Sequence, residues 1–177
     1  MKYTLDDIKF EQLTSRAFEN LCYDLLVIYN FHNLIWREGG VDSGRDIEGS
    51  YKFLNAIRHS ETKWFFECKH YTSGGVPPND INSKIAWGDA EQPDFLVFFI
   101  SSYLTNNART WIEKIIHQKQ YQIIIIEGEE LKNRTLKYPQ LIERYFSFNK
   151  YVQLFIDVKN YKTKFNINPS YEFLKEI

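Results

Sequence analysis

Apolar side chains recur at helical spacing near the start of this chain. The positions that fit one face of a helix are Phe18, Leu21, Cys22, Leu25, Leu26 and Tyr29. Thr14 precedes them and suits an N-cap, and Leu13 is placed to pack on Phe18 across the helix start. A first helix is therefore predicted after Thr14, with Glu19 at the edge of its apolar stripe.

The pattern then changes to shorter apolar runs separated by polar turns. An apolar stretch covers residues 31–36, and a strand is predicted over 45–53 after a glycine-rich turn. Residues 55–61 are polar and are expected to connect a hairpin, whose second strand covers 63–69. That second strand is apolar on both faces, as in the centre of a sheet, until Glu67 and Lys69 interrupt it.

The rest of the chain alternates between strand and helix. A loop over 71–78 leads to predicted helices over 80–91, after Thr105 and over 131–146 near Pro139, and to buried strands over 94–100 and 121–126. This alternation favours an α/β sandwich with a mixed sheet. Residues 1–150 are expected to form one domain, and residues 151–177 an extension or linker with room for a last strand.

Composition and net charge exclude some classes of protein but do not identify a function. The formal net charge of −1 excludes a general polyanion binder, so any nucleic acid must meet a local patch. Cys22 and Cys68 lie in apolar runs, which indicates reduced core cysteines rather than a disulfide or a zinc site. Because no signal region or membrane-length apolar run is visible, a soluble cytoplasmic protein is expected.

The charges at the end of the 63–69 strand indicate a catalytic centre. Alternate strand residues share a face, so Glu67 and Lys69 project together while Cys68 points away. Asp46 opens the preceding strand and can meet Glu67 at one end of the sheet. Two carboxylates form only part of a ligand set, which suits Mg²⁺ because this ion keeps several waters and can activate one of them for phosphodiester hydrolysis. A nearby lysine can stabilise the negative charge that develops.

These residues resemble a known family. Gly44-Arg45-Asp46 followed by Glu67-Cys68-Lys69 resembles the PD-(D/E)XK nucleases, and specifically their Mrr-like restriction endonuclease branch. Three further segments agree in order: Phe18-Glu19-Asn20-Leu21, residues 101–108 with their final alanine, and residues 126–131. The resemblance implies a restriction-endonuclease-like sandwich, a central mixed β-sheet flanked by helices.

The resemblance also assigns roles to individual residues. It implies that Asp46, Glu67 and the backbone carbonyl of Cys68 bind the metal, that Lys69 is the catalytic lysine, and that Glu19 is an accessory acid. The implied activity is a Mg²⁺-dependent endodeoxyribonuclease, with Mn²⁺ as a substitute, in restriction or anti-phage defence. Many members carry glutamine at the position of Glu67, whereas glutamate matches the wider superfamily.

Other residues are candidates for the functional site but also fit ordinary structural roles. Arg45, His70 and Lys84 are predicted to contact DNA, although His70 points to the opposite face from Lys69 and Lys84 also fits a solvated lysine. Asp42 competes with Asp46 for the first metal position, where turn aspartates are common. Glu48 shares a face with Asp46 and fits either a supplementary acid or an exposed residue.

Three functional alternatives stay open beside the nuclease that cuts DNA. They are a nuclease acting on RNA or on DNA ends, a catalytically idle DNA-binding or protein-interaction module, and a Rossmann-type nucleotide enzyme, whose G-x-G-x-x-G is absent here. No helix-turn-helix or zinc finger is visible. The domain is therefore expected to bind DNA as a homo-oligomer or as the effector part of a larger sensor protein.

Overall fold

The computed structural model describes residues 3–37, 46–54, 57, 59–147, 158 and 162. The expectation for residues 151–177 and the predictions for Asp42 and Arg45 therefore lie outside the described residues. Within them, a five-stranded sheet has the order β1-β2-β3-β5-β7, and a separate pair joins β4 to β6.

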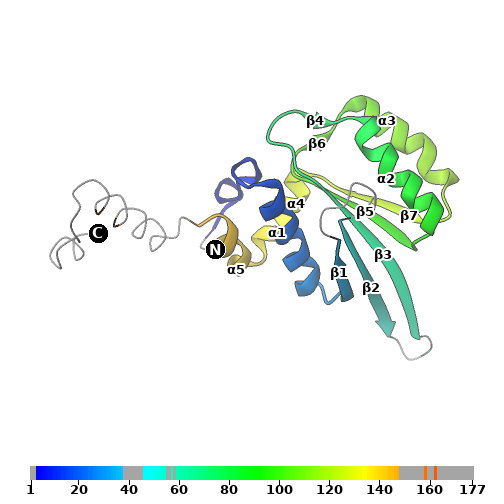
Figure 1. Ribbon diagram of the computed structural model, residues 1–177, viewed down its shortest axis with the longest axis horizontal. Helices are drawn as coiled ribbons and strands as arrows, with labels where there is room; N and C mark the ends of the chain where they lie inside the picture. Colours follow the sequence, from blue (N-terminus) through cyan, green and yellow to red (C-terminus); the bar gives the residue numbers. More distant parts are fainter. Residues whose placement is uncertain are drawn as a thin grey trace.

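The sheet is half antiparallel and half parallel. β1 (His32–Trp36), β2 (Ile47–Leu54) and β3 (His59–Lys69) run antiparallel to their neighbours, whereas β3, β5 (Phe95–Ile100) and β7 (Gln122–Ile126) run parallel. β3 is thus the central strand, as its apolar pattern predicts. Its polar first residues belong to the strand rather than to the expected connection, and the β2–β3 hairpin projects past the other strands in Figure 1.

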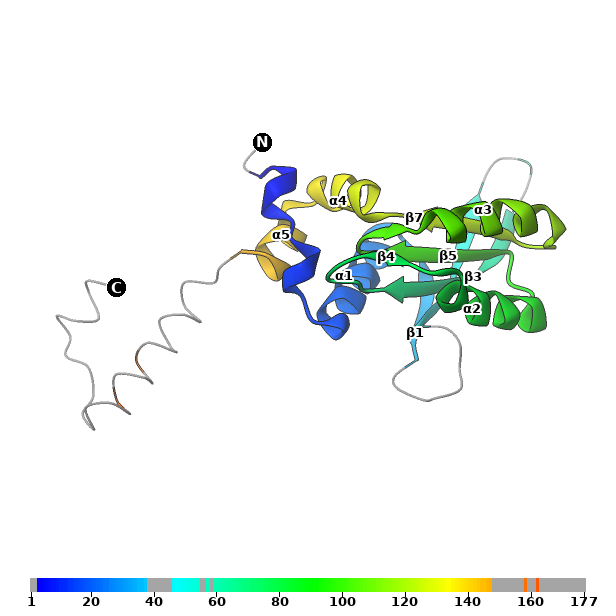
Figure 2. The ribbon, with the colours of Figure 1, turned by 90° about the horizontal axis from the view of Figure 1, so that it is seen from above.

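Helices form two groups around this sheet. One group comprises α2 (Pro78–Glu91) and α3 (Asn106–Ile115), and the other comprises α1 (Ser15–Ile28), α4 (Gly128–Leu136) and α5 (Pro139–Tyr145). Figures 1 and 2 both show the two groups at opposite ends of the molecule. Threonine hydroxyls cap two of these helices, Thr14 accepting from the Ala17 amide and Thr105 from the Ala108 amide.

Strand alternation divides the core between the two faces of the sheet. Phe65, Leu96 and Phe98 pack against α2 and α3, whereas Phe66 and Cys68 pack against α1, α4 and α5. Glu67 and Lys69, in phase with Phe65, consequently face the side of α2 and α3.

Short elements complete the fold. The 3-10 helices η1 (Leu5–Asp7), η2 (Phe10–Gln12) and η3 (Ile116–Gln118) accompany the longer helices. β4 (Gly75–Val76) lies inside the segment expected to be a loop over 71–78, and it pairs in parallel with β6 (Tyr103–Leu104). No helix in the described ranges is both long and apolar enough to cross a membrane.

Candidate active site

Asp46 is fixed to β3 by its backbone and by its side chain. Its amide donates to the Phe66 carbonyl at 3.2 Å, and its Oδ2 accepts a 2.6 Å hydrogen bond from the Cys68 amide. Ile47, the next residue, pairs with Phe66, so the register brings Asp46 beside Glu67. The two predicted carboxylates therefore meet at the C-terminal end of β3.

Glu67 is fully buried, and among the described residues neither of its carboxylate oxygens has a hydrogen-bond partner. Burial, followed by the negative charge of Asp46, raises the pKa of Glu67 from 4.5 to about 8, while Lys84 and Lys69 act in the opposite direction. A buried carboxylate without hydrogen bonds is costly unless a cation compensates it. Of the features of the site, this buried carboxylate argues most directly for a bound cation.

Two lysines lie beside that carboxylate. The Lys84 Nζ is 3.1 Å from Glu67 Oε2, and the Lys69 Nζ is 3.9 Å from the same oxygen. Lys69 comes from β3 itself, as predicted, but Lys84 comes from α2. The sequence points to Lys84 only as a DNA contact or a solvated residue, whereas the structure turns its ammonium towards Glu67.

The inward placement of Lys84 follows from helix geometry. Ile81, Ile85 and Gly88 are the buried residues of α2, and Lys84 lies on the same face as Ile81 and Gly88, three and four residues away. A lysine on a buried stripe was the available signal in the sequence. Gly88 allows close packing there, since a Cβ at this position would lie 2.7 Å from the Tyr121 hydroxyl.

Glu19 belongs to the same electrostatic cluster. Burial and then the charge of Asp46 raise the pKa of Glu19 above its ordinary 4.5, while Arg16 and Lys84 lower it. Glu19 thus approaches the site from α1, on the other side from α2. Its role as an accessory acid stays a prediction.

The donor set offers a divalent ion two carboxylates rather than a closed cage. Across the part of the chain that the structure describes, no three side chains of His, Cys, Asp or Glu gather closely enough to hold a metal. Mg²⁺ needs no such cage, because it keeps several waters and takes one or two carboxylates together with substrate phosphate. The buried carboxylate of Glu67 beside Asp46 therefore fits Mg²⁺ and does not fit a structural zinc site.

Two other predicted residues have partners within the chain. His70 turns away from Lys69, as expected, and its ring nitrogens lie 2.8 Å from the Phe10 carbonyl and 3.4 Å from the Ser15 hydroxyl. Its contact with DNA phosphate stays a prediction, which this placement does not support. Glu48 accepts a 2.9 Å hydrogen bond from Arg37, consistent with a structural ion pair.

Cys68 lies on the face opposite Glu67. It is buried and free, as is Cys22, and both belong to the core beneath α1. The neighbouring Cys22 thiol, followed by burial, raises the pKa of the Cys68 thiol, which keeps it neutral. The predicted reduced core cysteines are confirmed within this structure.

Contacts that the sequence did not indicate support the exit from β3. The Ser101 hydroxyl accepts from the Tyr71 amide and donates to the Tyr71 carbonyl. The Tyr71 hydroxyl donates to Asp80 in the first turn of α2. These bonds connect the ends of β3 and β5 to the helix that carries Lys84.

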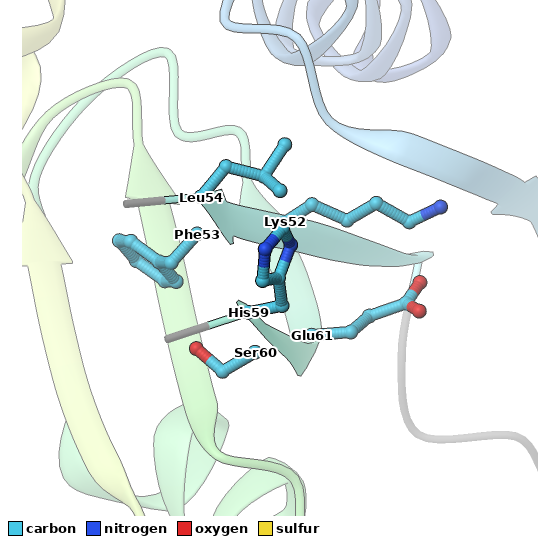
Figure 3. Close-up of a pocket in the computed structure, with 6 residues that line it drawn as sticks. All are labelled: Lys52, Phe53, Leu54, His59, Ser60 and Glu61. Atoms are coloured by element: carbon cyan, nitrogen blue, oxygen red, sulfur yellow. The ribbon is translucent and has the colours of Figure 1, made fainter. Parts of the chain in front are cut away.

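A pocket elsewhere on the sheet contains none of these residues. It is lined by Lys52, Phe53, Leu54, His59, Ser60 and Glu61, which Figure 3 shows on the two strands of the β2–β3 hairpin. The candidate site lies at the other end of β3, about 26 Å away at the usual rise of a strand.

Comparison with known proteins identifies a family and similar folds. The profile of the Mrr catalytic domain, a family described as restriction endonuclease, matches residues 10–135. A search of curated proteins found no match. Two solved structures are similar, the DNA modification-dependent restriction endonuclease AspBHI (12% identity, TM-score 0.56) and the MspJI restriction endonuclease in complex with a 27-mer oligonucleotide (14%, 0.55).

The two alignments differ in how much of each protein they include. They cover 82% and 96% of this chain but 42% and 37% of the AspBHI and MspJI chains, so this chain spans less than half of their length. At these identities the likeness concerns the fold, and the predicted restriction-endonuclease-like sandwich is confirmed.

Proposed function

Because this chain belongs to the Mrr catalytic-domain family of restriction endonucleases, we propose that it is an endodeoxyribonuclease that hydrolyses DNA phosphodiester bonds with the help of Mg²⁺. The predicted family is confirmed by the match over residues 10–135. The observation that carries the activity is the buried carboxylate of Glu67, which lies beside Asp46 and two lysines.

Asp46 and Glu67 would hold the ion, with the Cys68 backbone carbonyl as the third protein ligand. Bound Mg²⁺ polarises a phosphoryl group and lowers the pKa of a coordinated water. Asp46 is held for this role by the Cys68 amide, which fixes one carboxylate oxygen at 2.6 Å. Mn²⁺ would substitute, and Zn²⁺ would substitute poorly, because the ligands are hard oxygens.

Lys69 acts on the reacting groups rather than on the ion. Its ammonium shares a face with Glu67, and its side chain retains 17% exposure, so it can approach a phosphate that enters from solvent. There it orients the attacking water and stabilises the negative charge of the transition state. Arg45 and Lys84 are proposed to contact the DNA backbone.

The substrate and setting follow from the comparisons only by analogy. Both structural relatives are restriction endonucleases, and MspJI was solved with an oligonucleotide. We extend to this chain the cleavage of double-stranded DNA, in restriction or anti-phage defence within the cytoplasm. RNA cleavage and an idle binding module are the alternatives, and the intact set of Asp46, Glu67 and Lys69 argues against idleness.

Cleavage of supercoiled plasmid tests the proposal. We expect cutting with Mg²⁺ or Mn²⁺ and none with EDTA. Asp46→Asn keeps an acceptor for the Cys68 amide but removes the charge, and it should abolish cutting. Lys69→Ala should bind Mg²⁺ at least as tightly as wild type and cut about 10²–10³ times more slowly. Equal rates for Asp46→Asn and wild type would contradict the assigned centre, and a parallel single-stranded RNA substrate separates the RNA alternative.

A further inference from the structure

Lys84 approaches Glu67 more closely than the predicted catalytic lysine does. Its Nζ lies 3.1 Å from Glu67 Oε2, against 3.9 Å for Lys69. Both side chains are largely covered, with exposures of 21% for Lys84 and 17% for Lys69. A role confined to DNA binding does not explain why α2 directs a lysine into the protein at this point.

The buried carboxylate explains that direction. A carboxylate removed from water needs an opposite charge or hydrogen bonds, and among described residues Glu67 accepts no hydrogen bond. The contact with Lys84 is accordingly an ion pair across the interface between α2 and β3. An ammonium beside a metal-binding oxygen also opposes a second cation at that oxygen.

We propose that Lys84 is the internal counter-ion of Glu67 in the metal-free protein and gives up this contact when a divalent ion binds. This inference rests on the proposed function, since it takes Glu67 as a metal ligand. The lysine stem is flexible enough for such an exchange. Its predicted contact with DNA phosphate then belongs to the metal-loaded state.

The exchange predicts that removal of the Lys84 charge strengthens metal binding. Lys84→Met keeps the apolar stem and removes the ammonium. Calorimetry with MgCl₂ and no DNA, at pH 8.5, should show binding about tenfold tighter than wild type, the order expected for loss of a nearby like charge. A residue that only supports the fold would leave Mg²⁺ affinity unchanged or weaken it.

Two control variants separate a local effect from a change in net charge. Lys119→Met removes a positive charge that pairs with Asp89 at 2.7 Å, and it should leave Mg²⁺ affinity unchanged. Lys69→Met removes the farther ammonium and should strengthen binding less than Lys84→Met does. An equal gain in all three variants would overturn the proposal.

Thermal melting gives a second readout. Without Lys84, only the more distant Lys69 offsets the charge of Glu67 beside Asp46, so at pH 8.5 in EDTA Lys84→Met should melt at a lower temperature than wild type. Added Mg²⁺ should then raise its melting temperature more than that of wild type. Where Lys84→Met fails to fold, Lys84→Gln offers Glu67 a neutral donor and should show the same gain in Mg²⁺ affinity.

The outcomes distinguish this inference from the proposed function. A wild-type protein that binds no Mg²⁺ would overturn both. A wild type that binds Mg²⁺, together with folded Lys84 variants that bind it equally or more weakly, would overturn the exchange alone. Tighter binding in the Lys84 variants, unchanged binding in Lys119→Met and a smaller gain in Lys69→Met would support it.

Discussion

Glu67 should make the stability of the metal-free protein depend on pH. Its pKa is about 8 in the folded protein against 4.5 ordinarily, chiefly because it is buried. The fold therefore favours the protonated form, and this stabilisation is complete below about pH 4.5 and is lost as the pH rises to about 8. In EDTA, the free energy of unfolding should fall by at most about 1.4 kcal/mol per pH unit across that window.

Glu67→Gln provides the control, because glutamine keeps the shape but does not titrate. Urea titrations at pH 5.5, 7 and 8.5 should show a much flatter profile for Glu67→Gln than for wild type. Saturating Mg²⁺ should also flatten the wild-type profile, since it binds the ionised form. A wild type whose stability increased steadily over this range would contradict the assignment.

Cys68 should matter for packing and not for chemistry. Its thiol lies in the core with Cys22, on the face away from Lys69. Cys68→Ala should therefore cost about 1–2 kcal/mol in the free energy of unfolding and leave the cleavage rate per folded molecule unchanged. Urea denaturation beside plasmid cleavage checks both, and a stable but inactive variant would show that the thiol itself is used.

The residues of the site differ in how far the sequence could predict them. Asp46, Glu67 and Lys69 follow from strand alternation and from the motif, both of which are local in the chain. The contact between Lys84 and Glu67 depends on how closely α2 packs against β3. The sequence does not give that distance, so the contact emerged only from the structure. The partners of His70 depend likewise on the N-terminal segment that folds over α1.

At the scale of elements, two glycines should respond differently to the same substitution. A Cβ on Gly128, at the start of α4, would lie 2.7 Å and 2.8 Å from the carbonyl oxygens of Ser101 and Ser102. Backbone cannot yield easily there, so Gly128→Ala should lower the free energy of unfolding by about 1–3 kcal/mol. The hydrogen bond from the Gly128 amide to the Ser102 carbonyl would be lost as well.

Gly49 in β2 is the position to compare with Gly128, because an added Cβ there would also be crowded. Its Cβ would lie 2.7 Å from Leu34 Cδ2, the mobile end of a half-buried side chain. Leu34 can rotate away, so Gly49→Ala should lose less than about 1 kcal/mol. Thermal or urea unfolding of the two variants compares them directly, and a larger loss at Gly49 would refute this explanation.

Long, periodic elements could be predicted from the sequence, and short or exposed ones could not. α1 and α3 have apolar stripes and threonine caps, so their starts were predicted correctly. β4 and β6 have two residues each, too few to show any periodicity. Residues 59–61 at the start of β3 were assigned to the hairpin connection because they are polar and lack the apolar face that identifies a strand.

At the scale of the whole molecule, double-strand cleavage should require more than one copy. One centre cuts one strand, and a net charge of −1 gives little non-specific affinity for DNA. We expect a homo-oligomer, or an effector part of a larger sensor, to supply the missing affinity. The yield of linear plasmid should therefore rise more steeply than linearly with protein concentration, in step with assembly measured by light scattering.

Strictly first-order dependence, with a monomer making double-strand breaks, would contradict that expectation. Single-strand nicking provides the internal reference, because one copy suffices for it and its rate should stay closer to proportional. Asp46→Asn protein mixed with wild type is a further control. It should suppress linear product more than nicked product if two centres act together.

The central place of β3 also determines how long-lived the site is. Residues 64–66 of β3 are paired on both sides, with β2 and β5, while residues 59–63 pair with β2 and residues 67–69 pair with β5. In deuterium oxide, the backbone amides of Phe65 and Phe66 should exchange their hydrogens only when the entire sheet opens. Their slow exchange should persist in EDTA, because this framework exists before any ion arrives and a metal finds its ligands already arranged.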